Sequence, residues 1–106
     1  MKFDSAGEEA YYYSKIYPAV LAGAVKRVEL HRKFELLPKD EYCGIKLPAA
    51  HYTPDFMVEY MDGTVELVEV KSKFTRKMQR DYIYRRRLFI DLICRQNGWR
   101  FVEVIK

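Results

Sequence analysis

Three ionisable residues in the middle of the chain have types and a spacing that suit a metal-dependent hydrolytic site. Asp55 follows Pro54 at the start of one apolar stretch, and Glu69 and Lys71 lie two residues apart near the end of the next one. Carboxylate oxygens are ligands that Mg²⁺ accepts, and a lysine beside the ion can position water or stabilise developing negative charge. These groups can act together only if the fold brings Asp55 to Glu69 and Lys71.

A β-hairpin is the element that would bring them together. Phe56–Tyr60 and Val65–Val70 are rich in β-branched and aromatic residues, and Asp62-Gly63 lies between them as a turn signal. Pro54 stands just ahead of the first strand, where proline is tolerated. We therefore expect two antiparallel strands joined by a short loop.

The length of the hairpin loop decides which side chains share a face, because side chains alternate along a strand with period two. A two-residue loop would pair Asp55 with Val70 and send Asp55 and Glu69 to opposite faces. A three-residue loop ending at Gly63, with that glycine in the left-handed conformation, sets Asp55 directly across from Glu69 and puts Lys71 on the same face. We expect the three-residue loop.

A simpler interpretation of the same residues is a solvated strand face, on which a Glu–Lys pair merely stabilises the sheet. Two features oppose it. Glu69 and Lys71 alternate with Val68 and Val70 in a strand that otherwise has the composition of a central one. Ionisable groups in such a strand need partners or a metal ion.

The pattern Pro54-Asp55 followed by Glu69-Val70-Lys71 resembles the PD-(D/E)XK nuclease signature. Other segments are similar to small phage-encoded endonucleases of this superfamily: Lys2-Phe3-Asp4-Ser5 with Glu8 and Tyr11-Tyr12, Phe34-Glu35-Leu36-Leu37-Pro38, and Arg86-Arg87-Leu88-Phe89. The resemblance spans nearly the whole chain. His31 departs from it, since glutamine is expected there in the first strand.

This resemblance implies one α/β nuclease domain over residues 1–106, a restriction-endonuclease-like αβββαβ core with a small mixed sheet flanked by helices. It implies an enzyme, a metal-dependent endodeoxyribonuclease that uses Mg²⁺, with Mn²⁺ as the alternative ion, and no organic cofactor. The implied catalytic residues are Glu8, Asp55, Glu69 and Lys71. The implied metal ligands are Asp55, Glu69, the main-chain carbonyl of Val70, and Glu8, for one ion or two.

The implied substrate is branched DNA, as for Holliday junction resolvases in phage recombination or replication. Two symmetric cuts need two sites, so we expect a homodimer. Two other interpretations stay open: an end-cleaving nuclease subunit like that of a heteromeric transposase, whose YTPDF…EVK core is similar, and an inactive DNA-binding module with a nuclease fold. The short chain counts against the first, and the presence of all four expected site residues counts against the second.

Glu8 itself has two interpretations. Ser5 and Glu8 have the spacing of a capping box at the start of a helix, in which Glu8 would have no catalytic part. The resemblance instead gives Glu8 the role of first acid, reaching the metal from the helix. Glu9 takes that role if the register is off by one.

Basic residues gather in the last third of the chain. Residues 1–70 hold 8 Lys/Arg and 12 Asp/Glu, whereas residues 71–106 hold 11 and 3, a net charge of +8. Such a block attracts a polyanion. A solvated helix face is the alternative, but we expect DNA contacts here, with Arg85 nearest the site by analogy with the family. The candidate DNA-binding residues are Lys73, Arg76, Lys77, Arg80, Arg85, Arg86 and Arg87.

The remaining patterns predict the elements around the hairpin. We expect Ser5 to cap a first helix that kinks or breaks near Tyr17, because Pro18 lies inside it, and that ends at Gly23. The other expected elements are a strand over Lys26–Leu37, an irregular connection over Pro38–His51, a helix over Arg76–Asn97 stopped by Gly98, and a strand over Trp99–Ile105.

Composition limits the class of protein. Among 106 residues, 49% are hydrophobic and 32% charged, which is typical of a globular chain. No run of about 18 apolar residues exists, so no membrane span is expected. The N-terminus lacks the apolar core of a signal peptide. Cys43 and Cys94 lack metal-site spacing and are expected as reduced thiols, Cys94 in the core. We expect a cytoplasmic protein, in the host cytoplasm if it is phage-encoded.

Overall fold

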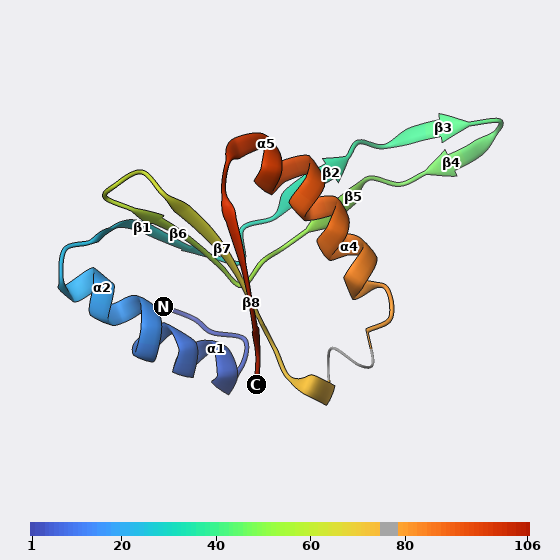
Figure 1. The fold of residues 1–106 in the computed structure, drawn as a ribbon. Helices are drawn as coiled ribbons and strands as arrows, with labels where there is room; N and C mark the ends of the chain where they lie inside the picture. Colours follow the sequence, from blue (N-terminus) through green and yellow to red (C-terminus); the bar gives the residue numbers. More distant parts are fainter. Residues whose placement is uncertain (75–78) are drawn as a thin grey trace.

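Four strands form the central sheet of the computed structural model, which describes residues 1–74 and 79–106. Their order is β1 (Val25–Leu30), β6 (Phe56–Tyr60), β7 (Val65–Lys71) and β8 (Arg100–Ile105). The first three are antiparallel neighbours, and β8 runs parallel to β7. Helical segments lie on both sides of this sheet (Figure 1). The predicted α/β class with a small mixed sheet is confirmed.

The β6–β7 hairpin has the expected three-residue loop. Phe56 pairs with Val68, and the Tyr60 amide donates to the Thr64 carbonyl at 2.9 Å. Gly63 takes a φ of +90°, a value at which a side chain would be strained. This register, continued by one residue, sets Asp55 opposite Glu69. The prediction that the two carboxylates share one face is confirmed.

The first helical segment covers one face of the sheet. It consists of α1 (Ala6–Tyr11), the π-helical turn η1 (Tyr12–Ile16) and α2 (Tyr17–Leu21). Buried side chains of η1 pack on inward-facing residues of β6 and β7, in a cluster made by Tyr12, Ile16, Phe56, Val58 and Val68. The alternate residues of the same strands face the other way, so the sheet is apolar on both sides.

The kink expected from Pro18 takes the form of a π-helical turn. The Tyr17 amide donates to the Tyr12 carbonyl, five residues earlier, and Pro18 follows in the first turn of α2. Proline has no amide hydrogen and its ring crowds the carbonyl four residues before it, so the regular ladder cannot continue there. The helix ends at Leu21, and Gly23 follows with a φ of +76°, as predicted.

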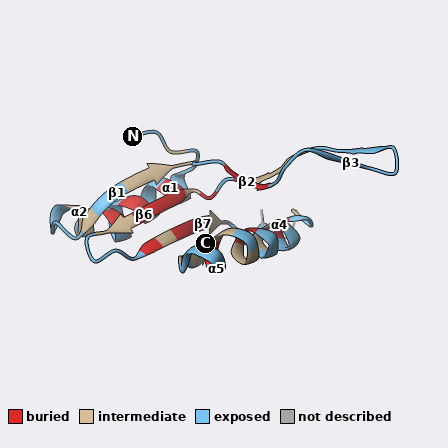
Figure 2. Cartoon of the chain, turned by 90° about the horizontal axis from the view of Figure 1, so that it is seen from above, coloured by how far each residue is buried: buried red, intermediate tan, exposed pale blue. Residues whose placement is uncertain are grey.

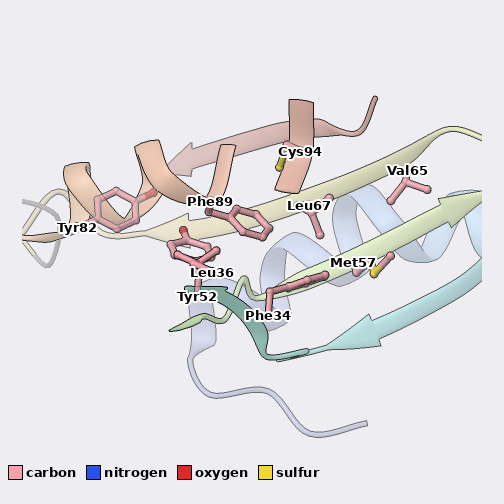
Figure 3. Close-up of a cluster of buried hydrophobic side chains, with 9 residues drawn as sticks. All are labelled: Phe34, Leu36, Tyr52, Met57, Val65, Leu67, Tyr82, Phe89 and Cys94. Carbon is pink, nitrogen blue, oxygen red and sulfur yellow. The ribbon is translucent and has the colours of Figure 1, made fainter. Parts of the chain in front are cut away.

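The second helical segment covers the opposite face. It runs through α4 (Tyr82–Phe89), η2 (Ile90–Cys94) and α5 (Arg95–Asn97) and ends at Gly98, whose φ is +70°. Figure 3 shows the buried cluster under it, formed by Phe34, Leu36, Tyr52, Met57, Val65, Leu67, Tyr82, Phe89 and Cys94. The core position predicted for Cys94 is confirmed, as are the stop at Gly98 and the last strand.

The start predicted for this helix is wrong. α4 begins at Tyr82 rather than at Arg76: Gln79 belongs to no helix or strand, Arg80 and Asp81 form a turn, and Asp81 is the residue before the first helical one. Thr75–Met78 lie outside the described residues, so the predictions on Arg76 and Lys77 stay predictions.

The single strand predicted over Lys26–Leu37 is also wrong. The structure divides it into β1 and β2 (Phe34–Leu37), with His31 at a φ of +54° between them. The His31 amide donates to the Asp55 carbonyl at 3.1 Å, which ends the pairing of β1 with β6. The chain then turns away, and β2 pairs with β5 (Ala50–Tyr52) in a separate two-stranded sheet.

The irregular connection predicted over Pro38–His51 contains a hairpin instead. Strands β3 (Asp40–Tyr42) and β4 (Ile45–Leu47) pair through a two-residue turn of Cys43 and Gly44, both with positive φ. Such backbone angles suit the tight turns that match strand twist. Figures 1 and 2 show this hairpin extending away from the sheet, with exposed residues along its whole length.

Candidate metal centre

All four predicted catalytic residues line one pocket. It lies where β6 begins and β7 ends, beside the first turn of α1. The hairpin register supplies Asp55, Glu69 and Lys71, and the capped helix supplies Glu8. The pocket residues are Ser5, Gly7, Glu8, Asp55, Glu69, Val70, Lys71, Ser72 and Lys106.

The Asp55 carboxylate is fixed by the strand across from it. Its Oδ2 accepts the Val70 amide at 2.7 Å, and its own amide donates to the Val68 carbonyl at 2.9 Å. Burial raises the pKa of Asp55, and the Val70 amide opposes that rise by stabilising the charged form. The Asp55 carboxylate is therefore fixed in direction, and its partly buried position disfavours a negative charge without a nearby cation.

Glu69 is the more enclosed of the two acids, with 5% of its surface exposed. The Tyr52 hydroxyl donates to Oε1 at 2.6 Å, and the Lys71 ammonium lies 3.8 Å from Oε2. Burial raises the pKa of Glu69, and the charge of Asp55 raises it further. A buried carboxylate beside a half-buried one is stabilised by a positive charge between them, which a divalent cation would supply.

Lys71 is held by residues that follow it in the chain. Its Nζ donates to Gln79 Oε1 at 2.8 Å and lies 4.9 Å from the centre of the Tyr82 ring. The Tyr82 hydroxyl in turn donates to Glu103 at 2.6 Å. Sequence reasoning missed the parts played by Gln79 and Glu103. Neither the alternation of residues in strands nor the spacing of the motif predicts these contacts, because they depend on where the second helix begins.

Glu8 is buried, with 4% of its surface exposed, and turns toward His31. The Ser5 hydroxyl accepts the Glu8 amide at 3.1 Å, so the predicted helix cap is confirmed. The Glu8 carboxylate lies 2.8 Å from His31 Nε2. Burial raises the pKa of Glu8, and the hydrogen bond to His31 opposes the rise. Glu9, the other candidate for first acid, is exposed on α1 and does not line the pocket.

His31 also contacts Asp4, whose Oδ2 lies 3.3 Å from the same Nε2. Oxygen atoms of Asp4 and Glu8 and the ring nitrogen of His31 all lie within 4.8 Å of one another. The sequence gave no sign that Asp4 would reach the ring of His31.

The predicted DNA-binding residues divide into two groups. Three are paired with acids: Arg85 with Asp81 at 3.0 Å, Arg86 with Glu103 at 2.6 Å and Arg87 with Asp91 at 2.6 Å. None of these three lines the pocket, and the approach of Arg85 to the site stays a prediction. Lys73 and Arg80 are exposed, and Lys106 lines the pocket although the sequence did not single it out.

The fold and pocket define an α/β protein with a cluster of carboxylates and a lysine at the end of a mixed sheet. The chain belongs to the DUF1064 family, because the family model described as "Protein of unknown function (DUF1064)" matches residues 1–100. Comparisons with curated proteins and with solved structures found no match. None of the helices in the described ranges is long and apolar enough to cross a membrane.

Proposed function

We propose that this chain is a Mg²⁺-dependent endodeoxyribonuclease with a PD-(D/E)XK-type centre in a restriction-endonuclease-like fold. One observation carries the proposal: Asp55 and Glu69 lie opposite each other on adjacent strands, and Lys71 and Glu8 line the same pocket. The Asp–Glu–Lys combination is the one that the resemblance of Pro54-Asp55 and Glu69-Val70-Lys71 calls for.

The donor set fits magnesium. Asp55, Glu69 and Glu8 offer carboxylate oxygens and Val70 a carbonyl oxygen, and hard oxygen donors are what Mg²⁺ selects over other ligands. Mn²⁺ accepts the same donors. When bound, the ion would neutralise phosphate charge and lower the pKa of a coordinated water. The raised pKa values of Asp55 and Glu69 support this assignment, because both acids lack a full counter-charge from the protein.

The protein's own groups would orient and neutralise the reactants. Tyr52 fixes the direction of Glu69, and the Val70 amide fixes Asp55. Lys71, held by Gln79, presents an ammonium group to the anionic phosphate and can position the attacking water. The free-energy cost of reorganising these groups on substrate binding would be small, because hydrogen bonds already fix the two acids.

DNA would approach from the basic C-terminal third. Lys71 and Lys106 stand in the pocket, and Lys73 and Arg80 are exposed nearby in the sequence. We propose branched DNA as substrate, in phage recombination or replication within the cytoplasm, cut by a homodimer in which each copy supplies one site.

Cleavage of a synthetic four-way junction, a matched linear duplex and supercoiled plasmid, with Mg²⁺ or Mn²⁺, tests the proposal. Asp55→Asn and Lys71→Met should each lower the rate on the order of 10²-fold or more, because the first weakens a metal ligand and the second removes the ammonium group that acts on the phosphate. Glu59→Gln is the matched control. Glu59 lies on β6 and pairs with Arg27 at 3.5 Å, outside the pocket, so its loss should leave cleavage unchanged.

The outcomes separate the alternatives. Cleavage by the wild type and the Glu59 variant that is lost in the other two supports the nuclease. DNA binding without cleavage in either metal identifies a binding module and overturns the proposal. Cleavage that survives Asp55→Asn places the chemistry elsewhere and overturns it as well.

A further inference from the structure

Asp4, Glu8 and His31 converge from three separate parts of the chain. Asp4 precedes α1, Glu8 lies in its first turn, and His31 follows β1. The ring nitrogen Nε2 of His31 lies 2.8 Å from Glu8 and 3.3 Å from Asp4. Glu8 is buried, His31 keeps 26% of its side-chain surface and Asp4 keeps 75%, so the group opens to solvent on the Asp4 side.

These separations suit a shared metal ion. Protein ligands bind zinc at about 2.0–2.2 Å, so two of them at tetrahedral or octahedral angles stand roughly 3.0–3.5 Å apart. The two nitrogen-to-oxygen distances, 2.8 and 3.3 Å, lie close to that range before any ligand adjusts. The third separation, between the carboxylate oxygens, is at most 4.8 Å, and the exposed Asp4 side chain is free to shorten it.

We propose that Asp4, Glu8 and His31 form a second cation site, selective for a borderline transition ion such as Zn²⁺ or Mn²⁺ over Mg²⁺. The imidazole nitrogen decides the selectivity, because it suits zinc and its neighbours, whereas Mg²⁺ takes oxygen ligands and keeps most of its water. Three protein ligands and an open solvent side leave room for water or for a substrate oxygen at the ion.

The second site lies directly beside the candidate metal centre and shares Glu8 with it. Glu8 lines the pocket together with Asp55, and the His31 amide donates to the Asp55 carbonyl at 3.1 Å. An ion held by Asp4, Glu8 and His31 would keep the Glu8 carboxylate directed at the histidine, and Asp55, Glu69 and Val70 would serve the magnesium position. The binding of the second ion stands on its own geometry, and only its effect on cleavage rests on the proposed function.

The chain contains two histidines, which makes the test direct. Imidazole resonances of His31 and His51 are followed by NMR while Zn²⁺ is added in the presence of excess Mg²⁺. His51 lies on β5 and does not line the pocket or join the proposed ligand set. We expect His31 to shift and saturate at one equivalent of Zn²⁺, and His51 to stay in place.

Asp4→Asn is the decisive variant, because Asp4 is exposed and lies outside any helix or strand, so its replacement should not affect folding. Glu8→Gln removes a buried charge and tests the same ligand set less cleanly. Loss of the Asp4 carboxylate should weaken Zn²⁺ binding on the order of 10-fold or more. His31→Gln should abolish one equivalent of binding, and His51→Gln should retain it.

No shift of His31 at stoichiometric Zn²⁺, equal shifts of both histidines, or unchanged affinity in Asp4→Asn would each overturn the site. The three side chains would then form only a histidine–carboxylate contact. The experiments test the zinc site and the nuclease activity independently. Zinc binding at His31 without DNA cleavage supports this site and overturns the nuclease. Magnesium-dependent cleavage without a zinc response does the reverse.

Discussion

Replacing Tyr52 by phenylalanine removes one hydroxyl from the candidate metal centre and keeps the packing of the ring. Tyr52 is 3% exposed, and its ring stacks on Phe89 with centroids 4.5 Å apart. The lost group is the donor to Glu69 Oε1 at 2.6 Å. Burial raises the pKa of Tyr52, so the hydroxyl keeps its proton and acts as a donor throughout the ordinary pH range.

The expected cost follows from the charge and burial of the acceptor. A hydrogen bond to an ionised group contributes about 1.5–3 kcal/mol, compared with about 1 kcal/mol for a neutral pair. A loss of about 2 kcal/mol lowers the Tm of a domain of this size by about 8–16 °C. The loss should grow with pH. The Tyr52 hydroxyl lowers the pKa of Glu69 by stabilising its charged form. The variant's free energy of unfolding should therefore drop further below that of the wild type as pH rises and Glu69 loses its proton.

Urea titrations at pH 5 and pH 8, without divalent cations, measure this difference. Tyr60→Phe is the matched control. Its hydroxyl donates to Glu66 at 2.8 Å on the same pair of strands, at a half-buried position away from the pocket. That variant should lose less stability than Tyr52→Phe, because solvent screens a hydrogen bond to a partly exposed carboxylate.

The reasoning is refuted if Tyr52→Phe costs no more than Tyr60→Phe, or if its cost is the same at both pH values. Either result would mean that Tyr52 does not stabilise the charged form of Glu69 in its buried position. The account of the candidate metal centre would then lose its electrostatic basis.

Three further outcomes are expected. Without divalent cations, the free energy of unfolding should fall as pH rises from near 4.5, the ordinary pKa of Glu69, toward the raised pKa of Glu69 in the folded protein. Added Mg²⁺ should reverse this fall. A free energy of unfolding that does not change with pH in urea titrations would contradict the expectation. A thiol reagent should modify exposed Cys43 quickly and buried Cys94 only on unfolding. Equal modification rates at the two cysteines would show that the core opens readily. Replacing Asp40–Leu47 by a two-residue turn should cost less than about 1 kcal/mol in a urea titration, because that hairpin is exposed; a larger loss would reveal packing that the structure does not show.

The hairpin that carries Asp55 and Glu69 could be predicted because its sequence offers few alternatives. Two apolar strands flank Asp62-Gly63, and Gly63 is the residue that can take positive φ without strain. Once the loop length is fixed, the period of two places every other side chain. Helix caps and stops were predicted for the same reason, because they depend on local backbone chemistry.

The rest depended on contacts between distant segments. His31 takes a φ of +54°, although it is not a glycine, and its amide is paired with the Asp55 carbonyl. Nothing near it in the sequence indicates that β1 stops there and that the chain leaves the sheet. The contacts of Lys71 with Gln79 are equally non-local. Pro18 indicated where the first helix would be disturbed, but whether it would bend or widen into a π turn depends on tertiary packing.

The projecting β3–β4 hairpin affects how the size of the protein will be measured. The radius of gyration is 15.4 Å and the longest dimension is 54 Å, whereas a compact chain of this length has a radius of gyration of about 13 Å. A single copy will therefore leave a gel-filtration column earlier than a spherical standard of equal mass. Light scattering, which reports mass without reference to shape, is thus the measurement that distinguishes one copy from the proposed pair.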